Sequence, residues 1–83
     1  MKVLIEADGG SRGNPGPAGY GAVVLTADRA TVLGERKQAI GMATNNVAEY
    51  RGLIAGLTEA VELGATEVAV SMDSKLVVEQ MAG

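Results

Sequence analysis

Cysteine and histidine are both absent from the 83 residues of this chain. Without cysteine there is no disulfide, no zinc–thiolate site and no thiol nucleophile, and the missing thiols also fit a reducing compartment. Without histidine, the chain lacks the commonest general base and the commonest ligand of transition metals. A metal bound by this chain must therefore be a hard cation held by oxygen atoms, such as magnesium, manganese or calcium.

Large aromatic side chains are scarce as well. Phenylalanine and tryptophan are absent, Tyr20 and Tyr50 are the two aromatic residues, and apolar residues nevertheless make up 47% of the chain. A chain of this length predicts one domain, whose core must be built from valine, leucine, isoleucine, alanine and methionine. No apolar run approaches the roughly 20 residues of a membrane span, and no signal-peptide pattern is present, so we expect a cytoplasmic protein without a membrane partner.

Positive charge is also in short supply. Seven lysine and arginine residues stand against ten aspartate and glutamate residues, which gives a net charge of -3. This balance argues against a broad basic surface for nucleic acid. Acidic residues that bind metal ions would be partly neutralised by those ions, which weakens the objection.

Hydrophobic patterning predicts an antiparallel meander in the first half of the chain. Residues 3–8, 20–26 and 31–41 are β-rich runs, and turn residues separate them. The first run leads into a double glycine, which is typical of a strand that meets a turn. We therefore expect three consecutive strands, with the third the most exposed because charges lie at its middle.

The second half predicts helices and a further strand. Apolar residues recur at helical spacing over residues 44–63, and Gly64 follows where a helix would end. Residues 66–73 predict a fourth strand and residues 74–82 a second helix. The fold class is therefore α/β with a mixed sheet, in which the fourth strand lies parallel to the first after a right-handed crossover.

Six of the twelve glycines and both prolines lie in the stretch DGGSRGNPGPAGYG, residues 8–21. A Walker phosphate loop would need a lysine where Ala22 stands, and a dinucleotide-binding loop would need a glycine where Val24 stands. Both phosphate-loop interpretations fail. A plain turn and the rim of a metal site remain as alternatives.

Three acids are predicted at element ends: Asp8 at the end of the first strand, Glu49 in the first turn of the helix, and Asp73 at the end of the fourth strand. Each has a structural alternative, because Glu49 follows Asn46 at capping-box spacing and Asp73 could cap the next helix. Parallel neighbours lie about 4.8 Å apart, so Asp8 and Asp73 would emerge together where open α/β sheets bind ligands. Such a carboxylate cluster, with Glu49 as a third ligand, suits divalent cations and two-metal phosphoryl chemistry.

Three segments in order, DGGSRGNPGPAGYGAVV, ATNNVAEYRGLIAGL and VSMDSKLVVEQ, resemble the successive motifs of type 1 ribonuclease H, in particular its bacterial and archaeal branch. The resemblance covers essentially the whole chain. It implies a ribonuclease H-like fold and an endoribonuclease that hydrolyses the RNA strand of RNA/DNA hybrids by two-metal-ion catalysis. Mg²⁺ is the implied cofactor, with Mn²⁺ as an alternative. Asp8, Glu49 and Asp73 would be catalytic metal ligands, with Asp8 bridging both ions and Glu49 close to the RNA 2′-hydroxyl.

The same resemblance implies a set of substrate contacts. Backbone groups after Asp8 would meet the minor groove and read the 2′-hydroxyls that distinguish RNA from DNA. Thr44 and the asparagines in the turn and at the start of the helix would hold bases and a backbone phosphate. Their structural alternative is loop and helix-cap duty, and Ser74 is interpreted first as a cap. The implied substrate-binding residues are Gly9, Gly10, Ser11, Arg12, Asn14, Thr44, Asn45 and Asn46.

The family pattern continues past the sequence given, with a fifth strand, a C-terminal helix and a fourth carboxylate. Residues 1–83 are therefore expected to form a ribonuclease H-like domain that is incomplete at its C-terminus. The alternative function is a catalytically impaired fragment, or a nucleic-acid-binding module of a larger ribonuclease H-containing protein. A strand at residues 67–72 with an uncovered edge would offer unpaired backbone groups to a second copy, which predicts a homodimer or swapped oligomer.

Overall fold

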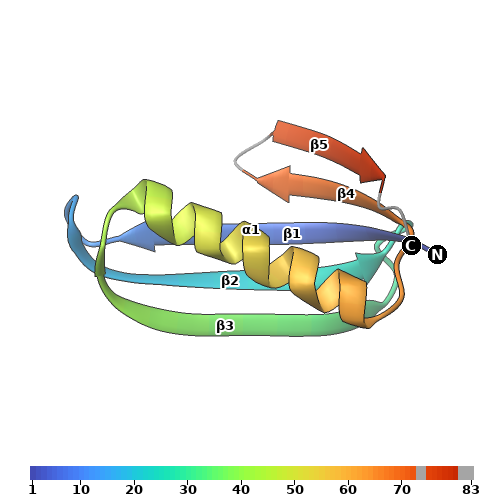
Figure 1. Ribbon diagram of the computed structural model, residues 1–83, viewed down its shortest axis with the longest axis horizontal. Coiled ribbons are helices and arrows are strands. Elements are labelled where there is room, and N and C mark those ends of the chain that lie inside the picture. The colour runs from blue at the N-terminus through green and yellow to red at the C-terminus, as the bar shows by residue number, and fades with distance from the viewer. Residues whose placement is uncertain (73–74, 81–83) are drawn as a thin grey trace.

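A computed structural model describes residues 1–72 and 75–80 of the chain. In this part of the chain, a five-stranded sheet carries one long helix on one face (Figure 1). The strand order across the sheet is β3-β2-β1-β4-β5. The elements are β1 (Lys2–Ser11), β2 (Gly16–Thr26), β3 (Val32–Ala43), α1 (Asn45–Glu62), β4 (Glu67–Met72) and β5 (Lys75–Gln80).

The predicted mixed sheet is confirmed. β1 pairs antiparallel with β2, and β2 pairs antiparallel with β3, as the predicted meander requires. β4 pairs parallel with β1, and α1 provides the connection between the meander and β4. The central strand β1 therefore has neighbours of opposite direction on its two sides.

The prediction that the first strand ends at Asp8 is wrong, because β1 continues to Ser11. Gly9 and Gly10 stay in the antiparallel ladder with β2, whose own start at Gly16 lies earlier than predicted. A double glycine permits a turn without requiring one, and backbone hydrogen bonds to β2 keep it extended. The turn itself occupies residues 12–15, where Gly13 has a φ of 81° and the Asn14–Pro15 peptide bond is cis.

The predicted helix over residues 74–82 is also wrong where the structure describes this segment. Residues 75–80 form β5, which pairs antiparallel with β4 along its whole length from Met72 to Glu67. The edge of β4 therefore carries a strand of its own chain, which corrects the expectation that residues 67–72 have an uncovered edge. The oligomer predicted from that edge loses its structural basis. The segment KLVVEQ contains two adjacent β-branched valines, and the backbone of β4 supplies hydrogen bonds that a short helix would largely lack.

The helix α1 matches its predicted range closely. Thr44 is its N-cap, since the Thr44 hydroxyl accepts a hydrogen bond from the Val47 backbone N–H at 3.2 Å. Leu63 is the C-cap, and Gly64 follows with a φ of 83°, the left-handed conformation that glycine adopts without strain. Both ends of the helix are thus fixed by residues that the sequence pattern identified.

The apolar residues that recur at helical spacing are Tyr50, Leu53, Ile54, Leu57 and Val61, and of these Leu53 and Leu57 pack against the core. The large residues Tyr50, Ile54 and Val61 are 68%, 53% and 59% exposed. Small residues instead point at the sheet and let the helix axis approach it closely. The buried helix residues are Ala48, Gly52, Ala55, Gly56 and Ala60.

The main core lies between α1 and the sheet. Val3, Ile5, Val24 and Val68, from three adjacent strands, are its largest fully buried side chains. A Cβ placed on Gly56 would lie 2.5 Å from Ile5 Cγ2, well inside van der Waals contact. The helix is therefore seated as closely on β1 as the absence of a side chain allows.

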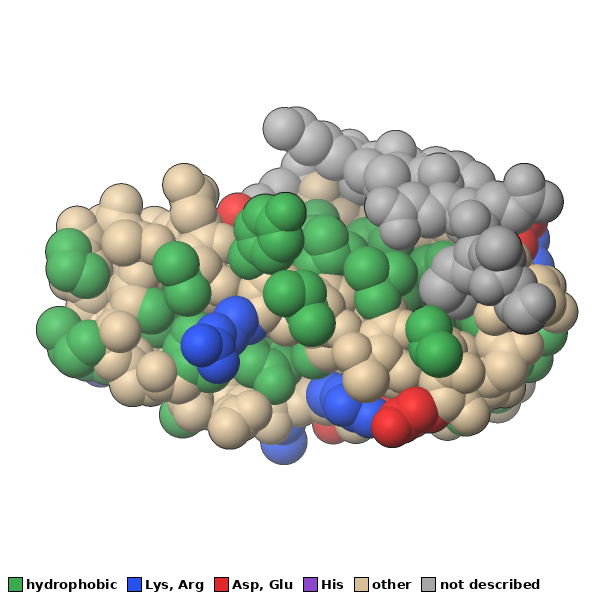
Figure 2. Space-filling model, viewed as in Figure 1, with side chains coloured by type: hydrophobic (Ala, Val, Ile, Leu, Met, Phe, Trp, Pro, Cys, Tyr) green, Lys and Arg blue, Asp and Glu red, His purple; other side chains and the backbone are tan. Residues whose placement is uncertain are grey.

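An exposed apolar stripe runs along the opposite side of α1. Figure 2 shows hydrophobic side chains gathered on the face of the molecule that α1 occupies. The exposed large apolar residues on the helix are Val47, Tyr50, Ile54 and Val61.

Within the described part of the chain, no helix combines the length and apolar character needed to span a bilayer.

Ionic contacts hold the C-terminal half of α1 against β3. Arg36 Nε donates to Glu59 Oε1 at 2.7 Å, and the other side of the guanidinium donates to Glu62. The hydrogen bond to Glu59 is the main reason that the pKa of Arg36 is raised above its ordinary value. These pairs are partly exposed, so they orient the helix more than they stabilise the fold.

The contact between α1 and β1 can be tested by adding one methyl group. For Gly56→Ala we expect the free energy of unfolding to fall by about 1 to 2 kcal/mol, because overpacking against the fully buried Ile5 outweighs the gain of about 1 kcal/mol in helix propensity. Urea unfolding followed by circular dichroism measures the change. Gly21→Ala is the matched control, since no heavy atom lies within 4 Å of the added Cβ. Equal stability of the two variants would contradict the close approach.

The N-cap gives a second stability prediction. Thr44→Ala removes the acceptor for the Val47 N–H, and we expect it to lower the free energy of unfolding by about 1 kcal/mol. Thr44→Ser keeps the hydroxyl and should retain most of that stability. The same urea titration compares the three proteins, and an equal loss in the serine variant would show that the cap is not the cause.

Candidate metal and nucleic-acid site

Asp8 lies two residues past the last described pair between the central strand and β4. That pair joins Glu6 and Ser71 in parallel register. On its other side Asp8 remains paired with Gly21 of β2. Asp8 is exposed, and its carboxylate is therefore available to solvent at the edge of the parallel half of the sheet.

Glu49 comes from the N-terminal half of α1 and is half-buried. The helix starts at Asn45, and its first turn contains no acidic residue, so the prediction that Glu49 lies in the first turn is wrong. The capping-box alternative with Asn46 is wrong as well, because Thr44 is the N-cap. The structure therefore contradicts the two helix-end explanations for this acid.

A glycine contact joins the segments that carry these two acids. A Cβ placed on Gly9 would lie 2.4 Å from both the carbonyl carbon and the carbonyl oxygen of Ala48, and 2.7 Å from the backbone nitrogen of Glu49. One helical turn later, a Cβ on Gly52 would lie 3.3 Å from the Asp8 carbonyl oxygen. The backbone at Asp8 and Gly9 therefore rests directly against the backbone of α1 at Glu49.

The predicted third acid, Asp73, lies outside the described residues. Over residues 1–72 and 75–80, no group of three or more histidine, cysteine, aspartate or glutamate side chains is arranged to hold a metal ion. The described donors are the carboxylates of Asp8 and Glu49, from two segments in backbone contact. Carboxylate oxygens are the donors that Mg²⁺ and Mn²⁺ prefer, so this pair fits a hard divalent cation.

The residues predicted to bind substrate form a cluster at the same end of the molecule. Ser11 at the end of β1 donates two hydrogen bonds to Asn45 Oδ1, from its backbone nitrogen at 2.7 Å and from its hydroxyl at 3.0 Å. The Asn45 backbone N–H in turn donates to Asn14 Oδ1 at 3.1 Å. The turn after β1 and the start of α1 are thus tied together by the polar residues themselves.

The other predicted substrate residues surround this tie. A Cβ on Gly10 would lie 3.7 Å from Asn45 Oδ1, an ordinary contact distance. Arg12 and Asn46 are both exposed, one in the turn and one in the first turn of α1. The structure therefore brings all eight predicted residues to the region where β1 ends and α1 begins.

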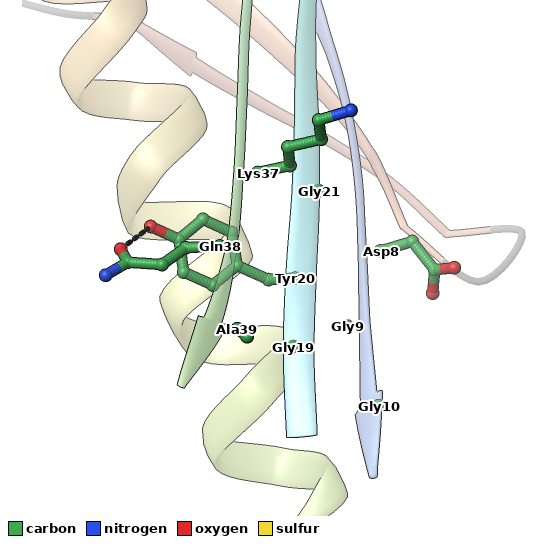
Figure 3. A pocket seen from close by; sticks show the side chains of 9 residues that line it. All are labelled: Asp8, Gly9, Gly10, Gly19, Tyr20, Gly21, Lys37, Gln38 and Ala39. Atoms are coloured by element: carbon green, nitrogen blue, oxygen red, sulfur yellow. Dashed lines mark hydrogen bonds between the residues drawn. The ribbon is translucent and has the colours of Figure 1, made fainter. Parts of the chain in front are cut away.

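A hollow of about 590 Å³ adjoins Asp8 on the sheet. Glycines from β1 and β2 form part of its lining, so few side chains fill it (Figure 3). Tyr20 and Gln38 lie at one side, joined by a hydrogen bond of 3.0 Å, and the Asp8 carboxylate points away from that pair. Lys37 of β3 also lines the hollow. None of these three neighbours was predicted as a site residue: Lys37 and Gln38 lie outside the motifs, and Tyr20 lies inside the first motif without an assigned role.

The role of the helix glycines was missed too, although the sequence contains a signal for it. Gly52 and Gly56 are spaced four residues apart, which places them on one helical face. Alanines continue this face in both directions. A glycine-and-alanine face on an amphipathic helix indicates close packing against another backbone, and this signal could have identified the contact with β1.

Residues 6–83 match the family described as "Reverse transcriptase-like". Among curated proteins, the chain is 84% identical, over all 83 of its residues, to a protein of Mycobacterium tuberculosis named as a bifunctional protein, of which it covers 23%. The chain thus spans about a quarter of the length of that relative.

Solved structures give the same result. The N-terminal ribonuclease H domain of a Mycobacterium tuberculosis protein, solved as a fusion with maltose-binding protein, is 83% identical with a TM-score of 0.87; the match covers 90% of this chain and 57% of that one. A ribonuclease H1 in complex with an RNA/DNA hybrid is 44% identical with a TM-score of 0.79, covering 88% of this chain and 55% of that one. As its three sequence motifs predicted, the chain belongs to the reverse transcriptase-like family of ribonuclease H-like domains.

Proposed function

We propose that this chain carries the metal-binding and hybrid-binding half of an endoribonuclease that hydrolyses the RNA strand of RNA/DNA hybrids. The observation that carries the proposal is the backbone contact at Gly9, which holds the segments of Asp8 and Glu49 together beside a cluster of polar turn residues. The likeness to a ribonuclease H1 whose structure contains an RNA/DNA hybrid supports the choice of substrate.

Asp8, Glu49 and Asp73 are the proposed ligands of Mg²⁺, with Mn²⁺ as an alternative. The bound ions would supply positive charge to activate a water molecule and to stabilise the leaving oxygen of the phosphodiester. The carboxylates would hold the ions, because Asp8 lies on the central strand and Glu49 on a capped helix. Asp8 and Glu49 would hold the ions beside the RNA strand that is hydrolysed.

The proposed substrate contacts lie at the junction of β1, the turn and α1. Backbone groups at the end of β1 would approach the minor groove, where the 2′-hydroxyl distinguishes RNA from DNA. The turn and the helix start would hold bases and a phosphate through their polar side chains. The residues proposed for these contacts are Gly9, Gly10, Ser11, Arg12, Asn14, Thr44, Asn45 and Asn46.

A second candidate function is a nucleic-acid-binding module or a catalytically impaired fragment. The observation that favours it is length, since this chain covers 57% of the solved ribonuclease H domain that it resembles at 83% identity. In that case residues 1–83 are one part of a ribonuclease H-like domain, and further residues supply a fourth carboxylate. A cytoplasmic location stays a prediction from the sequence.

Cleavage of a labelled hybrid tests the proposed reaction. We expect Mg²⁺- or Mn²⁺-dependent cleavage of the RNA strand by a form extended at the C-terminus to the length of the solved domains, and a loss of at least about 100-fold in its Asp8→Asn variant, because a metal ligand is removed. The measurement is the initial rate on an end-labelled RNA/DNA hybrid. An RNA/RNA duplex of the same sequence is the substrate control.

The 83-residue chain in the same assay separates the two candidates. Metal-dependent cleavage by the short chain favours the complete catalytic role, whereas hybrid binding without cleavage favours the binding module. Cleavage that survives Asp8→Asn in both forms would refute the assignment of Asp8 as a metal ligand.

A further inference from the structure

We propose that Gly9 is a positioning residue of the metal site: its missing side chain sets the place of Glu49 relative to Asp8, and the tie between Ser11 and Asn45 holds that place. The inference rests on the proposed function, because it concerns how the two carboxylates are presented to a divalent cation. It adds a role to Gly9 that is distinct from contact with the RNA.

The contact at Gly9 leaves no room for any side chain. The added Cβ of an alanine would lie 2.4 Å from the Ala48 carbonyl group, and carbon atoms in contact are normally about 3.5 to 4.0 Å apart. The obstacle is backbone, so no side-chain rotation relieves it. The start of α1 would have to move away from β1 by roughly 1 Å to restore a normal contact.

This displacement would move Glu49 with the helix and leave Asp8 in place on the strand. The backbone nitrogen of Glu49 is itself only 2.7 Å from the added Cβ, so Glu49 moves with the helix. Asp8 lies in the ladder of β1 with β2, opposite Gly21, and this pairing does not involve α1. The change therefore alters the separation of two carboxylates that a single metal centre would share. Such centres require placement to within about 0.5 Å.

The hydrogen bonds from Ser11 to Asn45 secure the same junction from the other side. They join the last residue of β1 to the first residue of α1, and Asn14 adds a third bond to the Asn45 backbone. Gly9 thus fixes how near the helix lies, and Asn45 fixes how far it can slide along the strand. The contact at Gly9 acts at Ala48 and Glu49, and the hydrogen bonds act at Asn45, four residues before Glu49.

A purely structural role for Gly9 makes a different prediction from a positioning role. If Gly9 served packing alone, its replacement would lower stability, and the folded molecules would bind metal as before. If Gly9 positions Glu49, the folded variant binds metal more weakly, and this loss depends on Glu49. A double-mutant cycle on metal affinity separates the two cases.

The experiment is Mn²⁺ binding to the 83-residue chain and to the extended form, measured by isothermal titration calorimetry below the unfolding transition. We expect Gly9→Ala to raise the Kd for Mn²⁺ by about 10-fold, within the 10- to 100-fold range typical when residues that orient metal ligands are changed. In a Glu49→Gln background, Gly9→Ala should change the Kd by less than about 2-fold, because the misplaced ligand is already gone. Gly21→Ala, opposite Asp8 with no atom within 4 Å of its Cβ, should match the wild type.

An unchanged Kd in folded Gly9→Ala, or an equal loss in the Glu49→Gln background, would overturn the inference. If circular dichroism shows that Gly9→Ala does not fold, Asn45→Ala is tested instead. We expect Asn45→Ala to raise the Kd for Mn²⁺ by about 3-fold or more, and the rise to disappear in the Glu49→Gln background. An unchanged Kd in Asn45→Ala would overturn the inference. Failure of the proposed function is seen separately: Asp8→Asn and Glu49→Gln would then leave the Mn²⁺ affinity unchanged.

Discussion

The contact between the backbones of β1 and α1 is the constraint on which the rest of the structure depends. Gly9, Gly52 and Gly56 let the helix rest on the central strand, with distances to a hypothetical Cβ from 2.4 to 3.3 Å. Because the core has few aromatic residues, its side chains can fill only a narrow space between helix and sheet. A helix close to the sheet therefore lets valines and isoleucines pack without voids. The same closeness places a helical acid beside a strand acid.

The central strand adds the second condition, because it carries Asp8 on a fixed backbone. Over the described residues, pairs with β4 reach as far as Glu6, and pairs with β2 continue to Ser11. The backbone of Asp8 is therefore held by β2, and its side chain is exposed. An acid at this point combines a fixed backbone with a solvent-accessible carboxylate, and a cation site needs both properties.

The sequence predicted the parts of the fold that depend on local chemistry. The range of α1 followed from periodicity, a Thr44 cap and the left-handed Gly64, and the strand directions followed from element order. Where the sequence misled, pairing with another strand decided the outcome: the double glycine after Asp8 stayed extended against β2, and the segment 75–80 became β5 on the edge of β4. The acids proposed for the site were predicted from their motifs, but the contact at Gly9 between the segments of Asp8 and Glu49 depends on backbone distances that no local pattern encodes.

The polar residues at the start of α1 serve the fold and the proposed substrate at once, and this limits what substitutions there can reveal. Asn45 Oδ1 accepts two hydrogen bonds from Ser11, so the groups that its side chain can offer to a nucleic acid are the amide donors. Such donors suit acceptors, namely phosphate oxygens and base carbonyls. Replacing Asn45 therefore removes an internal tie and an external donor together. Gly9 has no side chain to lose. A change in metal affinity on replacing Gly9 therefore reports where the helix lies, without the removal of a donor or acceptor group.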